Sequence, residues 1–252
     1  AQNIEPQYLR FPFTSCISGP GCLEKGQDLI ITDSNHSYGI SDRAIVDTAD
    51  SLIAIKKLVF DERKLTMDEL MNALDTNFEG ERGEEIRQLC LAAPKFGNDI
   101  DEADLMVRDV GRFSASVIMS YKNPFNIPCK ISREGLSWHY FGGLGVGALP
   151  NGRKSREPLN DGSISPMRGM DKLGPTAVLR SVVKAGFNES YASCLNQKFP
   201  GTVMQSPESR EKLAVLTDTF FRNGGQHIQY NLVDTAELLD AKAHPEKHRD
   251  LV

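Results

Sequence analysis

Long hydrophobic runs are absent from this sequence, and their absence limits where the protein can work. Hydrophobic residues make up 40% of the 252 positions, but no stretch approaches the roughly 20 apolar residues that a membrane-spanning helix needs. Residues 1–6 carry neither a positive charge nor an apolar core, so they do not form a signal peptide. Membrane and secreted proteins are therefore not the expected classes.

Cysteine and unbalanced charge are also scarce. The five cysteines are odd in number and widely scattered, which suits neither a disulfide framework nor a C-x-x-C metal site. We expect mostly free thiols in a reducing cytoplasm, and no metal bound by this chain. The net charge of −5, without a long run of either sign, does not indicate binding to nucleic acid or to a membrane surface.

What the sequence does contain is an alternation of helical and strand-like segments. Apolar residues recur with the helical period from Ser41 and from Thr66, and again over residues 81–93, 101–121, 172–185, 207–222 and 235–242. Strand-like runs cover residues 29–32, 202–205 and 227–233, whereas residues 1–27 read as irregular and residues 138–162 as glycine-dense. This alternation predicts an α/β fold.

Details of these segments give sharper expectations. Ser41 is the expected N-cap of the first helix, and Thr66 with Glu69 matches a capping box. The expected buried stripe of the long helix consists of Leu105, Val107, Val110, Phe113, Val117 and Ile118. No repeat or compositional break divides the chain, so we expect one partial domain over residues 1–252. Its ends read as those of a piece of a longer protein.

Cys22 is the first candidate for chemistry. It lies in a Gly-Pro-Gly turn, and Glu24 follows two residues later. In an extended or looped backbone, positions i and i+2 project to the same side, so thiol and carboxylate could reach one substrate. A neighbouring negative charge disfavours the thiolate, so the pair suits a cysteine that stays protonated and gives up a hydrogen atom. Taken alone, the pair fits a buried, inert cysteine beside a solvated glutamate better.

Several blocks further along the chain resemble signature segments of the glycyl radical enzymes, a family that includes pyruvate formate-lyase, glycerol and choline lyases, arylacetate decarboxylases and fumarate-adding synthases. The blocks are residues 151–162, 163–166, 174–179, 223–231 and 238–251. Once they are placed, residues 21–24 (Gly-Cys-Leu-Glu) fall where that family carries its Gly-Cys-x-Glu loop. The resemblance covers nearly the whole chain, and an ordered set of motifs is far more specific than one glycine-rich match.

The resemblance implies a fold and a radical mechanism. The fold would be the C-terminal portion of a ten-stranded α/β barrel, with residues 1–40 as the inner cysteine loop and residues 136–252 leading toward the glycyl radical loop. Cys22 would become the thiyl radical that takes hydrogen from the substrate, and Glu24 would be a general base or substrate anchor. The radical glycine is expected beyond Val252, so the chain alone should be inactive. The family also implies a radical S-adenosylmethionine iron–sulfur activating enzyme and a homodimer.

Residues near the cysteine bear on the branch of the family. Leu23 follows Cys22, which disfavours the pyruvate formate-lyase branch with its Cys-Cys pair. His36 is a substrate-binding candidate because arylacetate decarboxylases are similar in having a histidine near this place. A loop histidine with satisfied hydrogen bonds is an equally good interpretation of His36.

Glu157 is the second substrate-binding candidate, because the decarboxylases use a second glutamate at a comparable distance after the cysteine. It could instead brace its loop through Arg153 or Arg156, which is the slightly favoured reading. The leading functional expectation is a lyase that decarboxylates an arylacetate-type substrate. The alternatives are a radical eliminase for a diol, choline-like or sulfonate substrate, a fumarate-adding synthase, and a non-catalytic split fragment that needs a partner chain.

Overall fold

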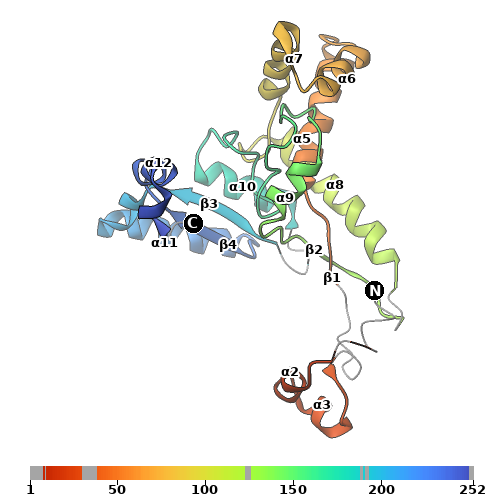
Figure 1. Ribbon diagram of the computed structural model, residues 1–252, viewed down its shortest axis with the longest axis vertical. Coiled ribbons are helices and arrows are strands. Elements are labelled where there is room, and N and C mark those ends of the chain that lie inside the picture. Colours follow the sequence, from red (N-terminus) through yellow and green to blue (C-terminus); the bar gives the residue numbers. More distant parts are fainter. Residues whose placement is uncertain are drawn as a thin grey trace.

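The architecture is described from a computed structural model, which defines residues 8, 10–29, 39–122, 126–187, 190 and 193–249 (Figure 1). The first half contains helices α2 (Pro12–Ile17), α3 (Pro20–Lys25), α5 (Ile45–Ile55), α6 (Met67–Asp75), α7 (Gly80–Ala92) and α8 (Asp101–Ser120), with strand β1 (Gly39–Ser41) and the π-helix η1 (Lys56–Asp61). The second half contains β2 (Lys130–Ser132), α9 (Trp138–Gly145), α10 (Pro175–Ala185), β3 (Leu195–Phe199), η3 (Gly201–Met204), α11 (Pro207–Arg222), β4 (Ile228–Leu232), α12 (Thr235–Ala243) and η4 (Pro245–Lys247).

The strands form two parallel pairs, which confirms the α/β class. In the first pair, Gly39 of β1 lies opposite Lys130 of β2. In the second, Leu195 of β3 lies opposite Ile228 of β4. Parallel neighbours need long crossover connections, which here contain helices α5 to α8 in the first pair and α11 in the second.

Helix α8 organises the core. It packs against both α5 and α10, and buried apolar side chains from these three helices join Leu195 of β3 and Phe220 of α11 in one cluster. A second cluster lies around α6 and α7, which sit together at one end of the molecule (Figure 1). The hairpin of α2 and α3 lies apart from both clusters in Figure 1.

Two expectations about helix starts had different outcomes. The capping box is confirmed, because Glu69 N donates to Thr66 Oγ1 at 3.1 Å and Thr66 N donates to Glu69 Oε2 at 2.8 Å. The N-cap expected at Ser41 is wrong. Ser41 ends strand β1, and α5 begins only at Ile45 after Ala44. Pairing of β1 with β2 takes Ser41 into the sheet, and a tertiary contact of this kind cannot be read from a local capping signal.

The expected buried stripe of α8 is right in part, since Val110 packs against the core cluster that contains Val107. Phe113 is 71% exposed and Val117 is 43% exposed, whereas Val107 is buried as expected. The buried face instead carries mostly small residues, such as Gly111 and Ala115. Small side chains let α5 and α10 approach closely, and a Cβ added at Gly111 would touch the Arg133 guanidinium at 3.4 Å. Periodicity weighted by large apolar residues therefore placed Phe113 and Val117 in a stripe that the core does not cover.

Of the two strands predicted in the C-terminal half, the structure confirms one. The strand expected over residues 227–233 is confirmed as β4, but residues 202–205 lie in η3 and its end, where Val203 N donates to the carbonyl of Pro200 at 3.0 Å. The strand precedes this turn, as β3. Residues 1–27 are not wholly irregular, since they include α2 and α3. The strand expected over residues 29–32 lies outside the described residues except for Leu29.

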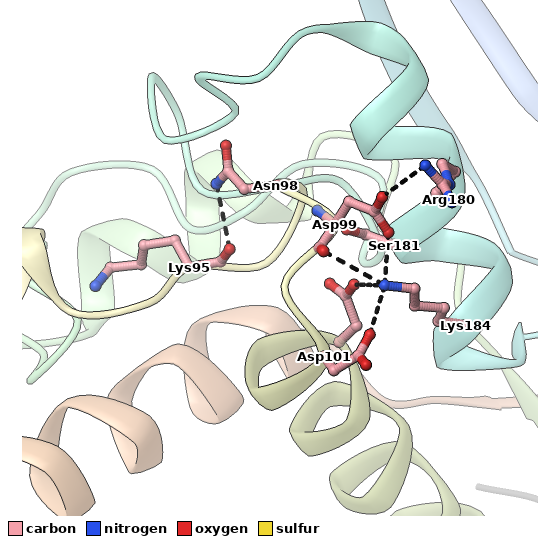
Figure 2. A network of polar contacts seen from close by, with 8 residues as sticks. Lys95, Asn98, Asp99, Asp101, Arg180, Ser181 and Lys184 are labelled. Atoms are coloured by element: carbon pink, nitrogen blue, oxygen red, sulfur yellow. Dashed lines mark hydrogen bonds and ion pairs between the residues drawn. The ribbon is translucent and has the colours of Figure 1, made fainter.

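A polar network fastens the start of α8 to α10 (Figure 2). The ammonium of Lys184 lies 2.5 Å from Asp99 Oδ1, 2.6 Å from Asp101 Oδ1 and 3.3 Å from Asp104 Oδ2. Arg180 forms a second ion pair with Asp99 at 3.0 Å. Acidic groups in the first turn of α8 also suit the positive end of its dipole, so the cluster fixes the relative position of the two helices.

Asp50 is a buried carboxyl group with a hydrogen-bond partner for only one of its two oxygens among the described residues. It is 0% exposed on α5, and one oxygen accepts a hydrogen bond from Phe96 N at 3.0 Å. The other oxygen has no hydrogen-bond partner among the described residues. Burial raises the pKa of Asp50 to about 7, against the lowering effects of the Phe96 hydrogen bond and the Lys95 charge.

We expect Asp50→Asn to remove a pH dependence from the stability of α5. Because the folded pKa lies above the ordinary value of 3.8, the contribution of Asp50 to stability is complete only below about pH 4 and declines as the pH rises to about 7. At pH 8 the amide variant should be roughly 1–3 kcal/mol more stable than the parent, and the two should converge near pH 4. Native-state hydrogen exchange of the α5 amides, corrected for intrinsic rates, measures this.

The matched control is Asp171→Asn, which changes an exposed aspartate. It should leave the pH dependence of α5 unchanged. If the parent and the Asp50→Asn protein showed the same α5 protection at pH 5 and pH 8, the assigned charge burial would be contradicted.

Candidate functional site

Cys22 lies in the third position of α3, between two glycines in positive-φ conformations. Gly19 precedes the helix with φ 146°, and Gly26 ends it with φ 58°. Proline at the first position and glycine just after the last are the residues that favour a helix start and stop. The short helix thus follows from the Gly-Pro-Gly and Gly26 positions, and it holds Cys22 at 7% exposure.

The Cys22 side chain lines a cavity of about 320 Å³ within the α2–α3 hairpin. The lining residues include Arg10, Cys16, Leu23 and Asp28. Two hydrogen bonds close the hairpin: Phe11 N donates to Asp28 Oδ2 at 2.6 Å, and Leu29 N donates to Ser15 Oγ at 2.9 Å. A volume of this size is at the lower end of small-molecule sites.

Glu24 does not share the orientation of Cys22. The expectation of an extended or looped backbone is wrong, since both residues belong to α3. Side chains two positions apart on a helix do not face each other. Consistently, Glu24 is exposed while Cys22 is buried, and Glu24 is not among the residues that line the cavity.

The two substrate-binding candidates are not brought to this cavity. His36 lies outside the described residues. Glu157 lies in the loop between α9 and α10, is exposed, and accepts a hydrogen bond from Lys154 N at 3.0 Å through its carboxylate. Its carbonyl oxygen accepts from Arg153 Nε at 2.9 Å. The geometry of Glu157 is that of the loop brace that the sequence also suggested.

The first signature block, residues 151–162, is built around a buried guanidinium. Arg153 is 1% exposed. Besides Glu157, it donates from Nη1 to the carbonyl of Gly147 at 2.7 Å and from Nη2 to the carbonyl of Gly143 at 2.8 Å. A Cβ at Gly143 would collide with the carbonyl oxygen of Glu157. Glycine at this position therefore allows the loop to close around Arg153.

Asp47 fastens both ends of the same block to α5. Its carboxylate accepts from Asn151 Nδ2 at 2.9 Å and from Asn160 N at 2.7 Å. Burial raises the pKa of Asp47, while these hydrogen bonds and the charge of Arg153 lower it. Sequence reasoning missed Asp47. An aspartate inside an apolar helical stripe was the available signal, because such a residue is buried only when it has partners.

Other groups of polar side chains offer little further chemistry. Among the described residues, no group of three or more His, Cys, Asp or Glu side chains could hold a metal ion. Nor does any helix in those residues combine the length and apolar composition that crossing a membrane requires. A polar cavity of about 140 Å³ beside β3 includes Asp161 and Lys198, but these two form an ion pair at 3.1 Å.

Two family models together match most of the chain. The model described as Pyruvate formate lyase-like matches residues 1–139, and the model described as Glycine radical matches residues 160–252. The first includes α3 with Cys22, and the second includes α10 to α12.

Known proteins resemble the chain along its whole length. It is 34% identical over 252 residues to trans-4-hydroxy-L-proline dehydratase of Clostridioides difficile, covering 100% of this chain and 32% of the relative. It is 30% identical to the 4-hydroxyphenylacetate decarboxylase glycyl radical subunit of the same species (strain CD196), covering 100% of this chain and 31% of the relative. A solved structure concerned with 1,2-propanediol dehydration in Roseburia inulinivorans matches with a TM-score of 0.89 at 34% identity, covering 98% of this chain and 32% of that one.

The chain therefore spans about a third of the length of the proteins it matches. The family models, the identities and the shared fold agree with the ordered motifs in residues 21–24 and 151–251. The similarity in fold also assigns the two parallel strand pairs to part of an α/β barrel of the pyruvate formate-lyase type. This chain belongs to the glycyl radical enzymes, the pyruvate formate-lyase-like family, and represents a C-terminal portion of one.

Proposed function

We propose that the full-length protein is a radical eliminase, which removes water or a comparable leaving group from a small polar substrate. The observation that carries this proposal is the sheltered Cys22 thiol, held on a glycine-bounded helix in a cavity of about 320 Å³. Exclusion of water protects reactive intermediates such as radicals from side reactions. Because the chain belongs to the glycyl radical enzymes, we assign the role of hydrogen-atom carrier to this buried thiol.

The chain supplies the hydrogen-atom carrier and the groups that keep it in place. A glycyl radical, expected on a glycine beyond Val252, supplies the unpaired electron that the chemistry needs. Once its own hydrogen atom has been removed, the Cys22 sulfur takes a hydrogen atom from a substrate carbon, and the S–H bond so formed later returns a hydrogen atom to the product radical. The low exposure of the thiol, 7%, fits this use.

Glu24 is proposed as the general base or substrate anchor. Its carboxylate is exposed and does not line the Cys22 cavity in this structure, so this role rests on the Gly-Cys-x-Glu motif of residues 21–24. His36 is proposed as a substrate hydrogen-bond donor. Glu157 is the weakest of the four proposed site residues, because its polar atoms already hold the loop around Arg153.

Elimination is favoured over decarboxylation by the relatives. Both the hydroxyproline dehydratase and the propanediol-related structure are 34% identical to the chain, whereas the decarboxylase subunit is 30% identical over a similar span. Decarboxylation of an arylacetate remains the second candidate, because the decarboxylase subunit also covers 100% of the chain. A radical S-adenosylmethionine activating enzyme and a homodimeric assembly in the cytoplasm are part of the same proposal.

The test is a product analysis on the full-length protein after anaerobic activation. We expect turnover of a substrate with a hydroxyl leaving group, such as 1,2-propanediol or trans-4-hydroxy-L-proline, with release of water and no release of carbon dioxide. Release of carbon dioxide from 4-hydroxyphenylacetate would overturn the eliminase proposal in favour of the decarboxylase.

A further inference from the structure

Helices cover one face of the β3–β4 pair and not the other. Leu195 of β3 belongs to the core cluster, and Ile228 of β4 packs against that cluster. Two positions further along β4, the hydroxyl of Tyr230 lies 2.6 Å from Thr217 Oγ1 of α11. Side chains alternate between the two faces of a strand, so residues 229 and 231 point away from α11.

The face opposite α11 is polar. Asn196 lies in register with Gln229, and Lys198 with Asn231, so these four side chains share that face. The two on β3 have a partner, because Asn196 Nδ2 donates to Asp161 Oδ1 at 3.3 Å and Lys198 forms an ion pair with Asp161 at 3.1 Å. Among the described residues, the amide groups of Gln229 and Asn231 make no hydrogen bond.

This polar face needs a polar cover. Parallel sheets nearly always have both faces covered. The shared barrel fold places the helices outside, so the face with Gln229 and Asn231 looks into the barrel. The inside of such barrels is commonly filled by apolar side chains, whereas two amides without partners need donors and acceptors. Because the chain covers 32% of its relative's length, most of the candidate cover lies outside residues 1–252.

The spacing of the two amides selects a peptide over a small substrate. Positions two apart on a strand are separated by roughly 6.6 Å, and an extended peptide repeats its N–H and C=O groups over the same distance. The hydroxyls of a 1,2-diol lie on adjacent carbons, much closer together, so one such molecule cannot bind Gln229 and Asn231 at once. A primary amide donates and accepts, and can therefore serve both groups of a peptide.

The course of the chain brings its C-terminal end back toward these strands. Asp234 follows β4 closely and accepts a hydrogen bond from Gly201 N at 2.9 Å, which ties the start of α12 to the turn after β3. Beyond α12, His248 Nε2 lies 2.7 Å from Asp240 Oδ2. The chain thus turns back along α12 before it reaches Val252, toward the end of the helix that lies beside β4.

We propose that the side chains of Gln229 and Asn231 bind the backbone of the segment that directly follows Val252 in the full-length protein. This segment lies extended across the polar face of β3 and β4. Each amide donates to a carbonyl oxygen of the segment and accepts from one of its N–H groups. The radical glycine is expected in the same segment, and only the consequence for radical transfer rests on the proposed function.

Hydrogen exchange of the unactivated full-length protein, read by mass spectrometry, tests this contact. The double variant Gln229→Met with Asn231→Leu keeps the size of both side chains and removes their hydrogen bonds. We expect the amides of the segment after Val252 to exchange about tenfold faster or more, because several hydrogen bonds are lost. The amides of α11 should be unchanged, which shows that the strands remain folded. Unchanged exchange of the segment would overturn the proposal.

A matched pair of amides provides the control. Asn72 on α6 and Gln88 on α7 are both exposed in the second core cluster's helices, at the other end of the molecule from β3 and β4 (Figure 1). The double variant Asn72→Leu with Gln88→Met makes the same chemical changes there. It should leave exchange of the segment after Val252 at the parent rate.

Photochemical crosslinking identifies the occupant directly. A benzophenone amino acid in place of Asn231 should crosslink to the segment after Val252. Crosslinks to the part of the protein that precedes Ala1 would overturn the proposal and assign the polar face to that part. A raised KM in the Gln229→Met, Asn231→Leu protein, with unchanged exchange of the segment, would instead assign the face to the substrate. Exchange and crosslinking need no turnover, so failure here is distinguishable from failure of the proposed function.

Discussion

Cys22→Ser is expected to reduce turnover of the activated full-length protein to the background rate without disturbing its fold. Serine is close to cysteine in size, so the 320 Å³ cavity and helix α3 should persist. The O–H bond is stronger than the S–H bond, so a serine cannot pass a hydrogen atom to and from the substrate at a useful rate. Anaerobic turnover measured with a hydroxyl-bearing substrate, together with circular dichroism, checks both parts.

A second thiol variant provides the control for this result. Cys194→Ser changes a partly exposed cysteine at the start of the second strand pair, away from the Cys22 cavity, and should leave turnover near the parent level. Substantial activity in Cys22→Ser would remove the proposed hydrogen-atom carrier. Loss of activity in both variants would point to a general requirement for thiols rather than a role for Cys22.

Arg153→Met should produce the largest loss of stability in the chain. The substitution keeps an unbranched side chain but removes every donor to the carbonyl oxygens of Gly143, Gly147 and Glu157. Each buried acceptor left without a partner costs about 1–3 kcal/mol, so we expect a loss of about 3 kcal/mol or more. Denaturant unfolding of the full-length protein, with hydrogen exchange over residues 143–160, measures the size and place of the effect.

Two further substitutions test whether the planar guanidinium is the cause. Arg153→Lys keeps the charge but cannot serve several carbonyls in one plane, so it should recover little of the loss. Arg156→Lys, at an exposed position three residues away, should change stability by less than about 0.5 kcal/mol. If Arg153→Met unfolded at the same denaturant concentration as the parent protein, a stabilising role for the buried Arg153 hydrogen bonds would be contradicted.

The sequence was most informative where a signal was local. The capping box at Thr66 and Glu69 and the extent of α11 depend on residues that interact within a few positions of each other. The predictions that were wrong concern residues whose structure depends on long-range contacts. Pairing with β2 placed Ser41 in a strand, and the packing of α5 and α10 on α8 leaves Phe113 and Val117 of the expected stripe exposed.

The candidate site was also predictable from motifs in the sequence but not where its structure depends on packing between helices. The ordered motifs identified the family and singled out Cys22, because a Gly-Cys-x-Glu segment followed by residues 151–162 has a specific spacing. The helical backbone of α3, which separates Cys22 from Glu24, arises from proline and glycine positions that were read as a turn. The shared cavity of Cys16 and Cys22 depends on how α2 packs against α3, which no pattern in residues 11–25 specifies.

The structure shows which contacts the residues of the signature block make, which the motif alone does not. Residues 151–162 contain a buried arginine, and two asparagines bind Asp47 from both ends of the loop. The guanidinium and Asp47 are hydrogen-bonded within the protein, whereas the buried Asn160 Oδ1 has no hydrogen-bond partner among the described residues. Within the described residues, the block therefore positions the segment between α9 and α10, while the chemistry is assigned to the hairpin that carries Cys22.

The most direct test of the account is electron paramagnetic resonance of the full-length protein after anaerobic activation, prepared once with ordinary glycine and once with Cα-deuterated glycine. The account predicts an organic radical signal whose hyperfine splitting shrinks on deuteration, because the unpaired electron lies on a glycine Cα. Turnover without such a signal, or a signal that deuteration leaves unchanged, would contradict the assignment of this chain to a working glycyl radical enzyme.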